Sequence, residues 1–537
     1  MQRRSMWTNL RFVVALILAK LAGFFSRRLG RGGGTTLPGR LALRICPEVL
    51  EILASQLSDG VVLITGTNGK TTTTKMVHTV LQAAGYQVAY NVSGANLTSG
   101  VASTLLAAAS WSGKLRQDMG LFETDERAFP RVLAATRPRV VVVTNFFRDQ
   151  LDRYGEVDHT VRLVHQALTR LGPQSRVLLN ADDPLVAGLA EGLSAQVLFF
   201  GQEAEGAGPR EGVVHPLQQV MDAHFCPHCG SPLKYDQVYY GHMGRYHCPQ
   251  CGARRPDPAV ALLTGIPSAP PAPVEDQDGL PLTIRTPEGL LRIQLRLPGS
   301  YNAYNALAAV AAAYVLGVPA PLIPEALGAM RSAFGRMEEI QLAGRRTLMI
   351  LVKNPTGFNE VLASLLQRRT AKVLVIAIND LTADGEDVSW LWDVDFEALA
   401  ASGQAARVVA SGLRAYDMAV RLKYAGLDES RLEVVPDLGA ALRRGLALAE
   451  ELTGPAREGL PAPRAVAAAA GGPDGTLHPG RGGGPQAGPE APGPRVEPGA
   501  LFPMDERLYV LPTYTAMLAL RHQLEEQKLV GRFWQET

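Results

Sequence analysis

Short hydrophobic runs alternate with helical patterns through the first half of the chain. Residues 61–65 form a β-branched run without polar alternation, as expected of a strand buried on both faces. A glycine-containing loop follows, and residues 70–84 then have a helical period. Similar patterns predict strands at residues 87–90, 139–144, 176–179 and 196–200, and an Ala-rich helix at 302–315. This alternation predicts an α/β domain with a doubly wound parallel sheet, which we place at residues 46–335.

A second alternating series follows a boundary near residues 335–345. It predicts strands at residues 347–352, 372–378, 407–410, 432–435 and 508–511. We expect a separate, smaller Rossmann-like domain over residues 336–537. Within it, residues 454–500 are dominated by Gly, Pro and Ala and contain few apolar anchors. Such a segment cannot bury enough surface to offset its ordering entropy, so we predict a disordered insertion there.

An apolar run precedes both domains. Lys20 interrupts it, Arg27 and Arg28 follow soon after, and the uninterrupted part is shorter than a bilayer requires. A secretory signal would need a small-residue cleavage site, and the Gly-rich, basic stretch that follows is a poor one. We expect an N-terminal segment of helix and linker over residues 1–45. Its apolar helix, at residues 8–26, would pack on the protein or rest on the membrane face.

Length, composition and charge set broad limits on function. A chain of 537 residues is too long for one compact core, so two to four domains are expected. Its hydrophobic and charged contents of 46% and 19% describe an ordinary folded protein. The net charge of +2 gives no reason to expect a broad basic field, so we predict no nucleic-acid partner. Five cysteines, four of them in close pairs, suit a reducing cytoplasm better than a secreted disulfide framework.

The loop after the first predicted strand is a candidate phosphate-binding loop. It contains Gly66, Thr67, Asn68, Gly69, Lys70, Thr71 and Thr72, and a helix follows it. Glycines let backbone N–H groups approach phosphates, and the helix N-terminus adds a positive partial charge. Lys70 would reach the β- and γ-phosphates of ATP, and the Thr71 hydroxyl would help to hold Mg²⁺. The spacing is two residues shorter than the general P-loop pattern, so a plain glycine-rich turn with a capping threonine is the alternative.

Polar groups follow other predicted strands at the same edge of the sheet. Glu123 ends a short apolar segment, where a parallel strand would deliver its carboxylate to a hard cation such as Mg²⁺. A solvated acidic turn is an equally good interpretation of this segment. The stretches at residues 145–153 and 180–184 also follow apolar strands, and each is compatible with ordinary turn chemistry.

Four cysteines form a candidate zinc site within residues 224–254. Cys226 and Cys229 form one C-x₂-C pair, and Cys248 and Cys251 form another after eighteen intervening residues. This spacing is typical of a zinc ribbon, in which four thiolates complete a closed, structural Zn²⁺ site. We expect the metal to set the fold of this small insertion, because the segment is too short to build a core of its own.

Together these motifs resemble the Mur ligase family. The phosphate loop, residues 145–153, 180–184 and 301–309, and the Gly-Arg-Met-Glu stretch at 335–338 occur in the family order. The resemblance is closest to the MurT family, the ligase-like subunits of lipid II isoglutaminyl synthase. Three features point there: the four-cysteine insertion and the stretches at residues 353–359 and 379–390. It extends from about residue 35 to the C-terminus, apart from residues 454–500.

The resemblance implies an ATP-dependent amidation in peptidoglycan biosynthesis. The α-carboxylate of D-glutamate in the lipid II stem peptide would be phosphorylated, and ammonia would displace the phosphate to give D-isoglutamine. Ammonia would come from a glutaminase subunit, GatD, because this chain shows no nucleophilic cysteine of its own. The expected enzyme is cytoplasmic and acts at the inner face of the membrane.

The resemblance also implies roles for single residues. Thr71 and Glu123 would hold Mg²⁺, Asn302 and Asn305 would contact adenine, and Arg336 would neutralise phosphate charge. Asp387 would complete the catalytic triad of the glutaminase across the subunit interface, unless Asp384 and Asp387 simply shape the turn at Gly385. Other Mur ligases have a second-metal histidine where this chain has Gln150, which leaves a second Mg²⁺ open.

Three other functions remain open from the sequence. A stand-alone Mur or folylpolyglutamate-type ligase would add an amino acid without a partner. A zinc-ribbon nucleic-acid binder would leave the phosphate loop unexplained. A catalytically inactive scaffold conflicts with the intact Lys70 and Thr71.

Overall fold

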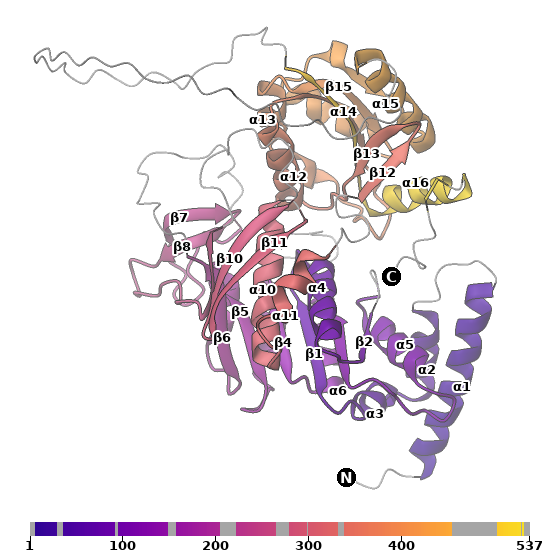
Figure 1. Cartoon of the computed structure of the whole chain (residues 1–537), viewed down its shortest axis with the longest axis vertical. Helices are drawn as coiled ribbons and strands as arrows, with labels where there is room; N and C mark the ends of the chain where they lie inside the picture. The colour runs from indigo at the N-terminus through magenta and orange to yellow at the C-terminus, as the bar shows by residue number, and fades with distance from the viewer. Residues whose placement is uncertain are drawn as a thin grey trace, which may run out of the picture.

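The computed structural model places two α/β bodies end to end along the longest axis of the molecule (Figure 1). The structure describes residues 6–28, 36–91, 95–148, 157–203, 222–264, 279–297, 299–330, 338–453, 502–527 and 529–530. The lower body carries a nine-stranded sheet and a small two-stranded hairpin, and the upper body carries a six-stranded sheet. The predicted disordered insertion at 454–500 and the domain boundary at 335–336 lie outside the described residues.

The larger sheet has the strand order β11-β10-β9-β6-β5-β4-β1-β3-β2. Its parallel part is built from largely apolar runs, because helices cover both of its faces. These strands are β1 (Gly60–Thr65), β2 (Val88–Tyr90), β3 (Met119–Glu123), β4 (Val140–Val143), β5 (Arg176–Asn180), β6 (Gln196–Gln202) and β9 (Val260–Thr264). The predicted parallel sheet is therefore confirmed.

One edge of this sheet is antiparallel, which the sequence analysis did not predict. Strands β10 (Leu280–Thr286) and β11 (Gly289–Leu295) form a hairpin that pairs with β9. In β11 exposed and buried residues alternate, as expected where only one face of a strand is covered. Antiparallel strands need only a tight turn, so this edge is added without a crossover helix.

Two groups of helices cover the faces of the larger sheet. On one face lie α4 (Lys70–Ala83), α10 (Ser300–Leu316) and α11 (Leu322–Gly328). The other face packs against helices from the N-terminal half: α2 (Leu37–Ile45), α3 (Val49–Ala54), α5 (Thr98–Ala108), α6 (Phe129–Thr136), α8 (Val157–Leu168) and α9 (Pro184–Ala187), which continues into η1 (Gly188–Ala190). Helix α2 occupies part of the segment that was expected to be a linker.

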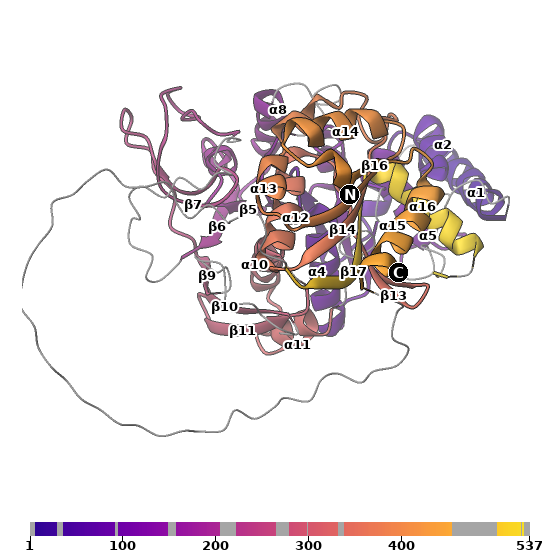
Figure 2. The same cartoon turned by 90° about the horizontal axis from the view of Figure 1, so that it is seen from above.

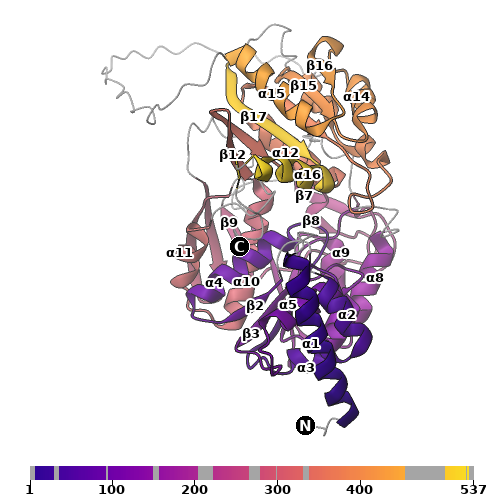
Figure 3. The ribbon, with the colours of Figure 1, turned by 90° about the vertical axis from the view of Figure 1, so that its right-hand side faces the viewer.

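The N-terminal helix α1 (Met6–Arg28) extends two residues beyond each end of the predicted helix. Lys20 lies within this helix, and its Nζ donates to the Ala109 carbonyl at 2.5 Å and lies 5.4 Å from the centre of the Trp111 ring. By length and composition alone residues 7–26 could cross a membrane, which corrects the expectation that the run is too short. Figure 3 shows α1 at the surface, in front of α2 and α5.

The upper body contains the second sheet, of order β12-β13-β17-β14-β15-β16. Only the first pair is antiparallel, and the sheet is otherwise parallel. Its strands are β12 (Glu338–Leu342), β13 (Arg345–Met349), β14 (Ala371–Ala377), β15 (Ala405–Ser411), β16 (Leu432–Val434) and β17 (Met504–Pro512). The last strand in sequence lies at the centre of the sheet, and β12 was not predicted.

Helices also cover both faces of this second sheet. One face packs against α12 (Pro355–Gln367), α13 (Phe396–Ala401) and α14 (Ala415–Tyr424), and the other against α15 (Leu438–Thr453) and α16 (Tyr514–Glu526). Two short 3₁₀ turns, η3 (Ser389–Asp393) and η4 (Glu429–Arg431), complete the described elements. Seen from above, the small hairpin of β7 (Lys234–Tyr240) and β8 (Met243–His247) and helix α1 lie at opposite sides of the molecule (Figure 2).

Candidate functional site

The candidate phosphate loop joins β1 to α4 at the end of the lower body that faces the upper body. Gly66 and Gly69 have φ angles of 123° and 86°, which favour glycine. A Cβ atom on Gly66 would lie 2.4 Å from the Thr144 hydroxyl, and one on Gly69 would lie 2.2 Å from Asn305 Oδ1. Both glycines are therefore required by the backbone angle and by close packing.

Lys70 opens α4 and is buried with its ammonium inside the loop. Its Nζ donates to the Gly66 carbonyl at 2.5 Å, the Thr67 carbonyl at 3.2 Å and Glu126 Oε1 at 3.0 Å. Burial alone lowers the pKa of Lys70, but the nearby carboxylates, Glu126 first, raise it above its ordinary value. The loop therefore holds a charged ammonium, as binding of a phosphate anion requires.

Thr71 and Glu123 come together at the ends of α4 and β3. The Thr71 hydroxyl donates to Glu123 Oε2 at 2.7 Å, and Asn96 Nδ2 donates to Glu123 Oε1 at 3.3 Å. The Glu123 backbone is held in turn by the Asn91 side chain, which accepts its N–H at 2.9 Å. A hydroxyl beside a carboxylate is an oxygen-rich donor set, and it fits a Mg²⁺ ion.

Asn68 lies between the two bodies and has an unused donor. Its backbone N–H donates to Asn145 Oδ1 at 2.8 Å, and its Oδ1 accepts from Asn354 Nδ2 at 3.0 Å. Its own Nδ2 is buried and has no hydrogen-bond partner in the part of the chain that the structure describes. A buried, unpaired donor in a phosphate loop fits an anionic ligand such as a nucleotide phosphate.

The neighbouring threonines have mainly internal contacts. The Thr67 hydroxyl donates to the Phe147 carbonyl at 3.2 Å and accepts the Phe147 N–H at 3.0 Å. Thr72 is buried at the start of α4. These hydrogen bonds join the phosphate loop to the segment that follows β4.

Asn302 and Asn305 lie in the first turns of α10, beside the phosphate loop. Asn305 Nδ2 donates to Asn302 Oδ1 at 3.1 Å, and Asn305 Oδ1 accepts from the Thr73 hydroxyl at 3.3 Å. The structure thus brings both asparagines next to the first turn of α4, beside the phosphate loop. Arg336 and Gln150, the other positions singled out from the sequence, lie outside the described residues.

Several contacts of the loop were not singled out from the sequence. Glu126 pairs with Lys70, and Asn96 and Asn91 hold Glu123. Glu126 lies three residues after Glu123, and nothing in the spacing of these carboxylates indicated which one would face the lysine. The two asparagines had no sequence signal, because their role depends on how β2 and β3 pair.

Side chains of residues 180–184 hold the backbone that follows β4, next to the phosphate loop. Asn180 Nδ2 donates to the Thr144 carbonyl at 2.9 Å, and Asp183 accepts the Phe146 N–H at 2.8 Å and caps α9. Asp182 is buried in an ion pair with Arg255 at 2.6 Å. These side chains are engaged within the protein, so the motif acts as a structural support for the strand edge.

Asp384 and Asp387 have different surroundings. Asp384 is buried and accepts from the Thr515 N–H at 2.8 Å and from the Thr515 hydroxyl. It therefore ties the loop after β14 to α16. Asp387 is exposed and accepts from the Ser389 N–H and hydroxyl at 2.8 and 2.9 Å, just before η3. This orients a carboxylate that remains accessible from outside.

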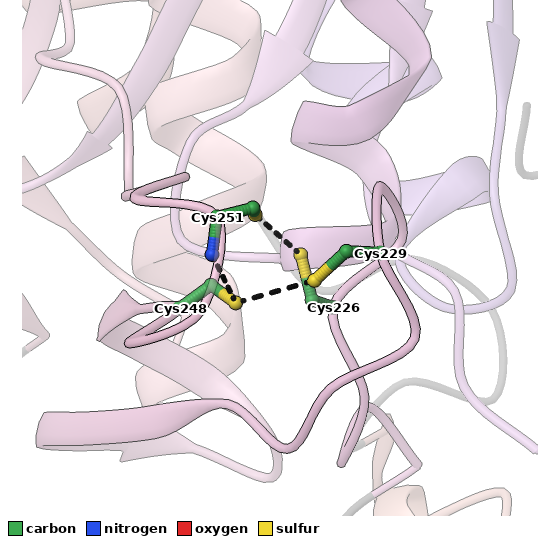
Figure 4. A group of neighbouring side chains, drawn as sticks. All are labelled: Cys226, Cys229, Cys248 and Cys251. Atoms are coloured by element: carbon green, nitrogen blue, oxygen red, sulfur yellow. Dashed lines mark hydrogen bonds between the residues drawn. The ribbon is translucent and has the colours of Figure 1, made fainter.

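The four paired cysteines converge from two loops (Figure 4). Their sulfur atoms all lie within 4.8 Å of one another, with separations of 3.6 Å for Cys226–Cys251 and 3.5 Å for Cys229–Cys248. Four thiolates 2.3 Å from a zinc ion would be about 3.8 Å apart. Hydrogen bonds to Ser231 lower the pKa of Cys229 to about 6, whereas burial and the other three thiols raise the pKa of Cys251 to about 12. The cluster fits a tetrahedral metal ion.

The turn of the cysteine-bearing hairpin reaches the phosphate-loop side of the sheet. His242 is fully buried there, with Nε2 3.2 Å from Asp183 Oδ1 and its ring centre 4.6 Å from that of Phe147. Asn180 Nδ2 lies 3.2 Å from Met243 Sδ. Because Phe147 also bonds to Thr67, the hairpin and the phosphate loop share a neighbour.

Comparisons with known proteins identify the family. A model described as the Mur ligase middle domain matches residues 64–230, and one described as the MurT ligase C-terminal domain matches residues 351–453. The chain is 36% identical over 416 residues to the lipid II isoglutaminyl synthase (glutamine-hydrolyzing) subunit MurT of Staphylococcus aureus, covering 77% of this chain and 88% of that protein. The chain belongs to the MurT family. The MurT subunit of Streptococcus pneumoniae is 32% identical, over 81% of this chain and 92% of its own.

Solved Mur ligase structures share the fold of this MurT family member. A pseudomurein peptide ligase type C from Methanothermus fervidus has a TM-score of 0.58 at 19% identity and covers 88% of this chain and 80% of its own. MurF from Acinetobacter baumannii has a TM-score of 0.58 at 18% identity, over 91% of this chain and 80% of its own. The predicted Mur-ligase fold, with two α/β bodies, is confirmed.

Proposed function

We propose that this chain is the ligase subunit of an enzyme that amidates the stem peptide of lipid II in peptidoglycan biosynthesis. The MurT relationship over most of the chain, together with a charged Lys70 inside an intact phosphate loop, carries this proposal. The reaction would convert the α-carboxylate of D-glutamate into the amide of D-isoglutamine. ATP and Mg²⁺ would bind at the end of the lower body that faces the upper body.

The chemistry requires activation, because a carboxylate is a poor electrophile. A carboxylate oxygen attacks the γ-phosphorus of ATP, and ADP leaves with the electron pair of the broken P–O bond. Ammonia then attacks the carbonyl carbon of the acyl phosphate, phosphate leaves, and one proton is released as the amide forms. Mg²⁺ would supply charge neutralisation for the transferred group.

The residues of the loop have distinct roles in this proposal. Lys70 neutralises phosphate charge, and the unpaired Nδ2 of Asn68 donates to a phosphate oxygen. Thr71 and Glu123, already 2.7 Å apart, would hold Mg²⁺. Asn302 and Asn305 would contact the adenine, and Arg336 would add a positive charge from the boundary between the domains.

Ammonia would come from a glutaminase partner of the GatD type that binds the upper body. Asp387 would orient the histidine of the partner and stabilise its imidazolium form. Large apolar side chains of the upper body are exposed on the segments after β14 and β15 and on α14: Leu381, Trp392, Leu413, Tyr416 and Tyr424. Exposed aromatic and apolar groups, with an accessible carboxylate between Leu381 and Trp392 in the sequence, are the composition expected of a protein interface.

The four-cysteine cluster would hold a structural Zn²⁺ ion. All four ligands come from the protein, so such a site has no open position for a substrate. The enzyme would be cytoplasmic and would act at the inner face of the membrane, where a lipid-linked precursor is accessible.

The decisive experiment supplies lipid II, Mg-ATP and an ammonia source to the purified chain, with and without its glutaminase partner. We expect amidated lipid II by mass spectrometry with ammonium alone, and with glutamine only when the partner is present. Addition of an amino acid instead of ammonia would identify a stand-alone ligase and reject the proposal.

A second experiment separates the two active sites. We expect Asp387→Asn to abolish glutamine-driven amidation and to leave ammonium-driven amidation intact. Glu450→Gln, which removes an exposed carboxylate of α15 on the other face of the upper sheet, is the matched control. Loss of both reactions in Asp387→Asn would reject the triad role of Asp387.

A further inference from the structure

The outer face of α1 exposes a continuous apolar stripe. Trp7, Leu10, Val14, Ile17, Leu21 and Phe24 are 40 to 68% exposed. They recur at alternating intervals of three and four residues, which places them on one side of a helix. Scattered exposed apolar residues are ordinary on a soluble protein, but a stripe along a whole helix marks a surface that binds something apolar.

The opposite face of α1 is fixed to the lower body. Ala15, Leu16 and Ala19 are buried against the helices of that body. The Arg11 Nε donates to the Ile45 carbonyl at 2.7 Å, and Lys20 Nζ donates to the Ala109 carbonyl. The helix lies along the side of the lower body (Figures 1 and 3). The exposed fractions of its apolar side chains show that the stripe is directed outward.

The charge of the N-terminal segment indicates what the stripe faces. The first 47 residues contain nine Arg or Lys residues and no Asp or Glu, whereas the whole chain has a net charge of only +2. The remainder of the chain is therefore net negative. Positive charge concentrated around an apolar helix with Trp and Phe is typical of a helix that lies in the interface of an anionic bilayer.

We propose that α1 docks this protein on a membrane surface that contains anionic lipid. The stripe lies at the boundary of headgroups and acyl chains, the helix axis lies in the membrane plane, and the net positive charge of the N-terminal segment attracts the anionic headgroups. A second copy of the chain is disfavoured as the occupant, because such a contact would bring two strongly basic segments together. The inference rests on the proposed function for its purpose, since it would hold the ligase beside a lipid-linked substrate.

Vesicle co-sedimentation tests this proposal with the full chain. We expect wild-type protein to bind phosphatidylglycerol-containing vesicles, to bind pure phosphatidylcholine vesicles less, and to lose affinity as salt is raised. The double variant Ile17→Glu, Phe24→Glu should have an affinity for the anionic vesicles that is lower by about tenfold or more, since charges in the interface oppose insertion. Leu290→Glu, at an exposed apolar position of β11, is the matched control and should bind like wild type.

Other results would overturn it. Wild-type protein that does not bind vesicles, or a double variant that binds as well as wild type, rejects α1 as the docking surface. Resistance to carbonate extraction would show a spanning helix, and a dimer in light scattering that the double variant abolishes would show a second copy. Amidation of detergent-dispersed lipid II, measured on the same samples, reports on the proposed function separately. The double variant should retain it and fail only on vesicle-embedded substrate.

Discussion

Lys70 and Glu126 form an ion pair inside the phosphate loop, and each side chain is almost fully buried. The ammonium also donates to two backbone carbonyls of the loop, so the protein itself holds Lys70 in position without a ligand. A buried charge is costly when its partner is lost, because desolvation is no longer offset by the opposite charge. The stability of the loop and its capacity to bind phosphate therefore depend on the same two residues.

We expect Lys70→Ala to abolish nucleotide binding and to lower the melting temperature, since Glu126 is left buried and unpaired. The destabilisation should be about 3 kcal/mol or less, because Glu126 can take up a proton instead. The double variant Lys70→Ala, Glu126→Gln should recover part of the stability without recovering nucleotide binding. Calorimetry with Mg-ATP and thermal unfolding measure the two effects. Nucleotide binding by the double variant at wild-type affinity would contradict the role of Lys70.

His78, in the same helix as Lys70, predicts a dependence of stability on pH. Burial, with a smaller contribution from Lys75, lowers the pKa of His78 from 6.5 to about 4, and its ring stacks on Tyr90. Below pH 6.5 His78 is protonated in the unfolded chain, whereas in the folded chain it stays neutral until the pH falls to about 4. The contribution of His78 is therefore complete above pH 6.5 and is lost as the pH falls towards 4.

We expect His78→Gln to lose less stability than wild type between pH 7.5 and pH 5, by about 1–2 kcal/mol. Denaturant unfolding at the two pH values measures this difference. His522→Gln, an exposed histidine on α16, is the control and should follow the wild-type profile. Equal pH dependence of wild type and His78→Gln would show that His78 titrates normally.

At the scale of elements, the cysteine-bearing hairpin is joined to the phosphate loop through Phe147. The buried turn at His242 contacts the Phe147 ring, and the Phe147 backbone bonds to Thr67. The hairpin has little core of its own, so we expect its order to depend on a metal ion held by the four cysteines.

We expect Cys229→Ser to release zinc, to destabilise the hairpin and to weaken Mg-ATP binding severalfold through Phe147. Metal content by mass spectrometry, thermal unfolding and calorimetry measure the three effects. Cys46→Ser is the matched control, because Cys46 lies outside the cluster and contacts Glu48. Zinc that stays stoichiometric in Cys229→Ser would contradict the four-thiolate site.

At the scale of the whole molecule, the two bodies meet beside the phosphate loop. Asn354 of the upper body donates to Asn68 and also caps α12 by accepting the Gly357 N–H at 2.8 Å. Arg148 of the lower body lies 3.0 Å from Asp393 of the upper body, in a partly exposed pair that adds little stability. The Asn68–Asn354 contact therefore places the upper body directly against a residue of the phosphate loop.

Two substitutions of Asn354 separate its roles. Asn354→Ser keeps a capping oxygen but cannot reach Asn68, so we expect near-wild-type stability. The kcat/KM for ATP should fall about tenfold, because roughly one hydrogen bond is lost. Asn354→Ala loses the cap as well and should also destabilise the upper body by about 1 kcal/mol. Steady-state kinetics and thermal unfolding of both variants measure this. Unchanged kinetics in both would exclude a role for the contact in turnover.

The amino-acid sequence by itself determined the features that depend on neighbouring residues. Apolar runs predicted most parallel strands of both sheets, though not β9, because strands covered on two faces need continuous hydrophobicity. The Gly-Lys-Thr stretch predicted a strand–loop–helix unit, and the cysteine spacing predicted a cluster that the folded chain does assemble. Each of these signals lies within a few residues or within one hairpin.

The tertiary structure alone decided how distant segments meet. The pairing of Asn68 with Asn354 joins residues 286 positions apart, and β17 enters the centre of its sheet between strands that precede it by more than a hundred residues. Whether the apolar α1 would be buried was undecided in the sequence, since composition does not say which face finds a partner. Only packing against the lower body fixes one face of α1 and leaves the other outward, because burial depends on the surfaces that the rest of the chain provides.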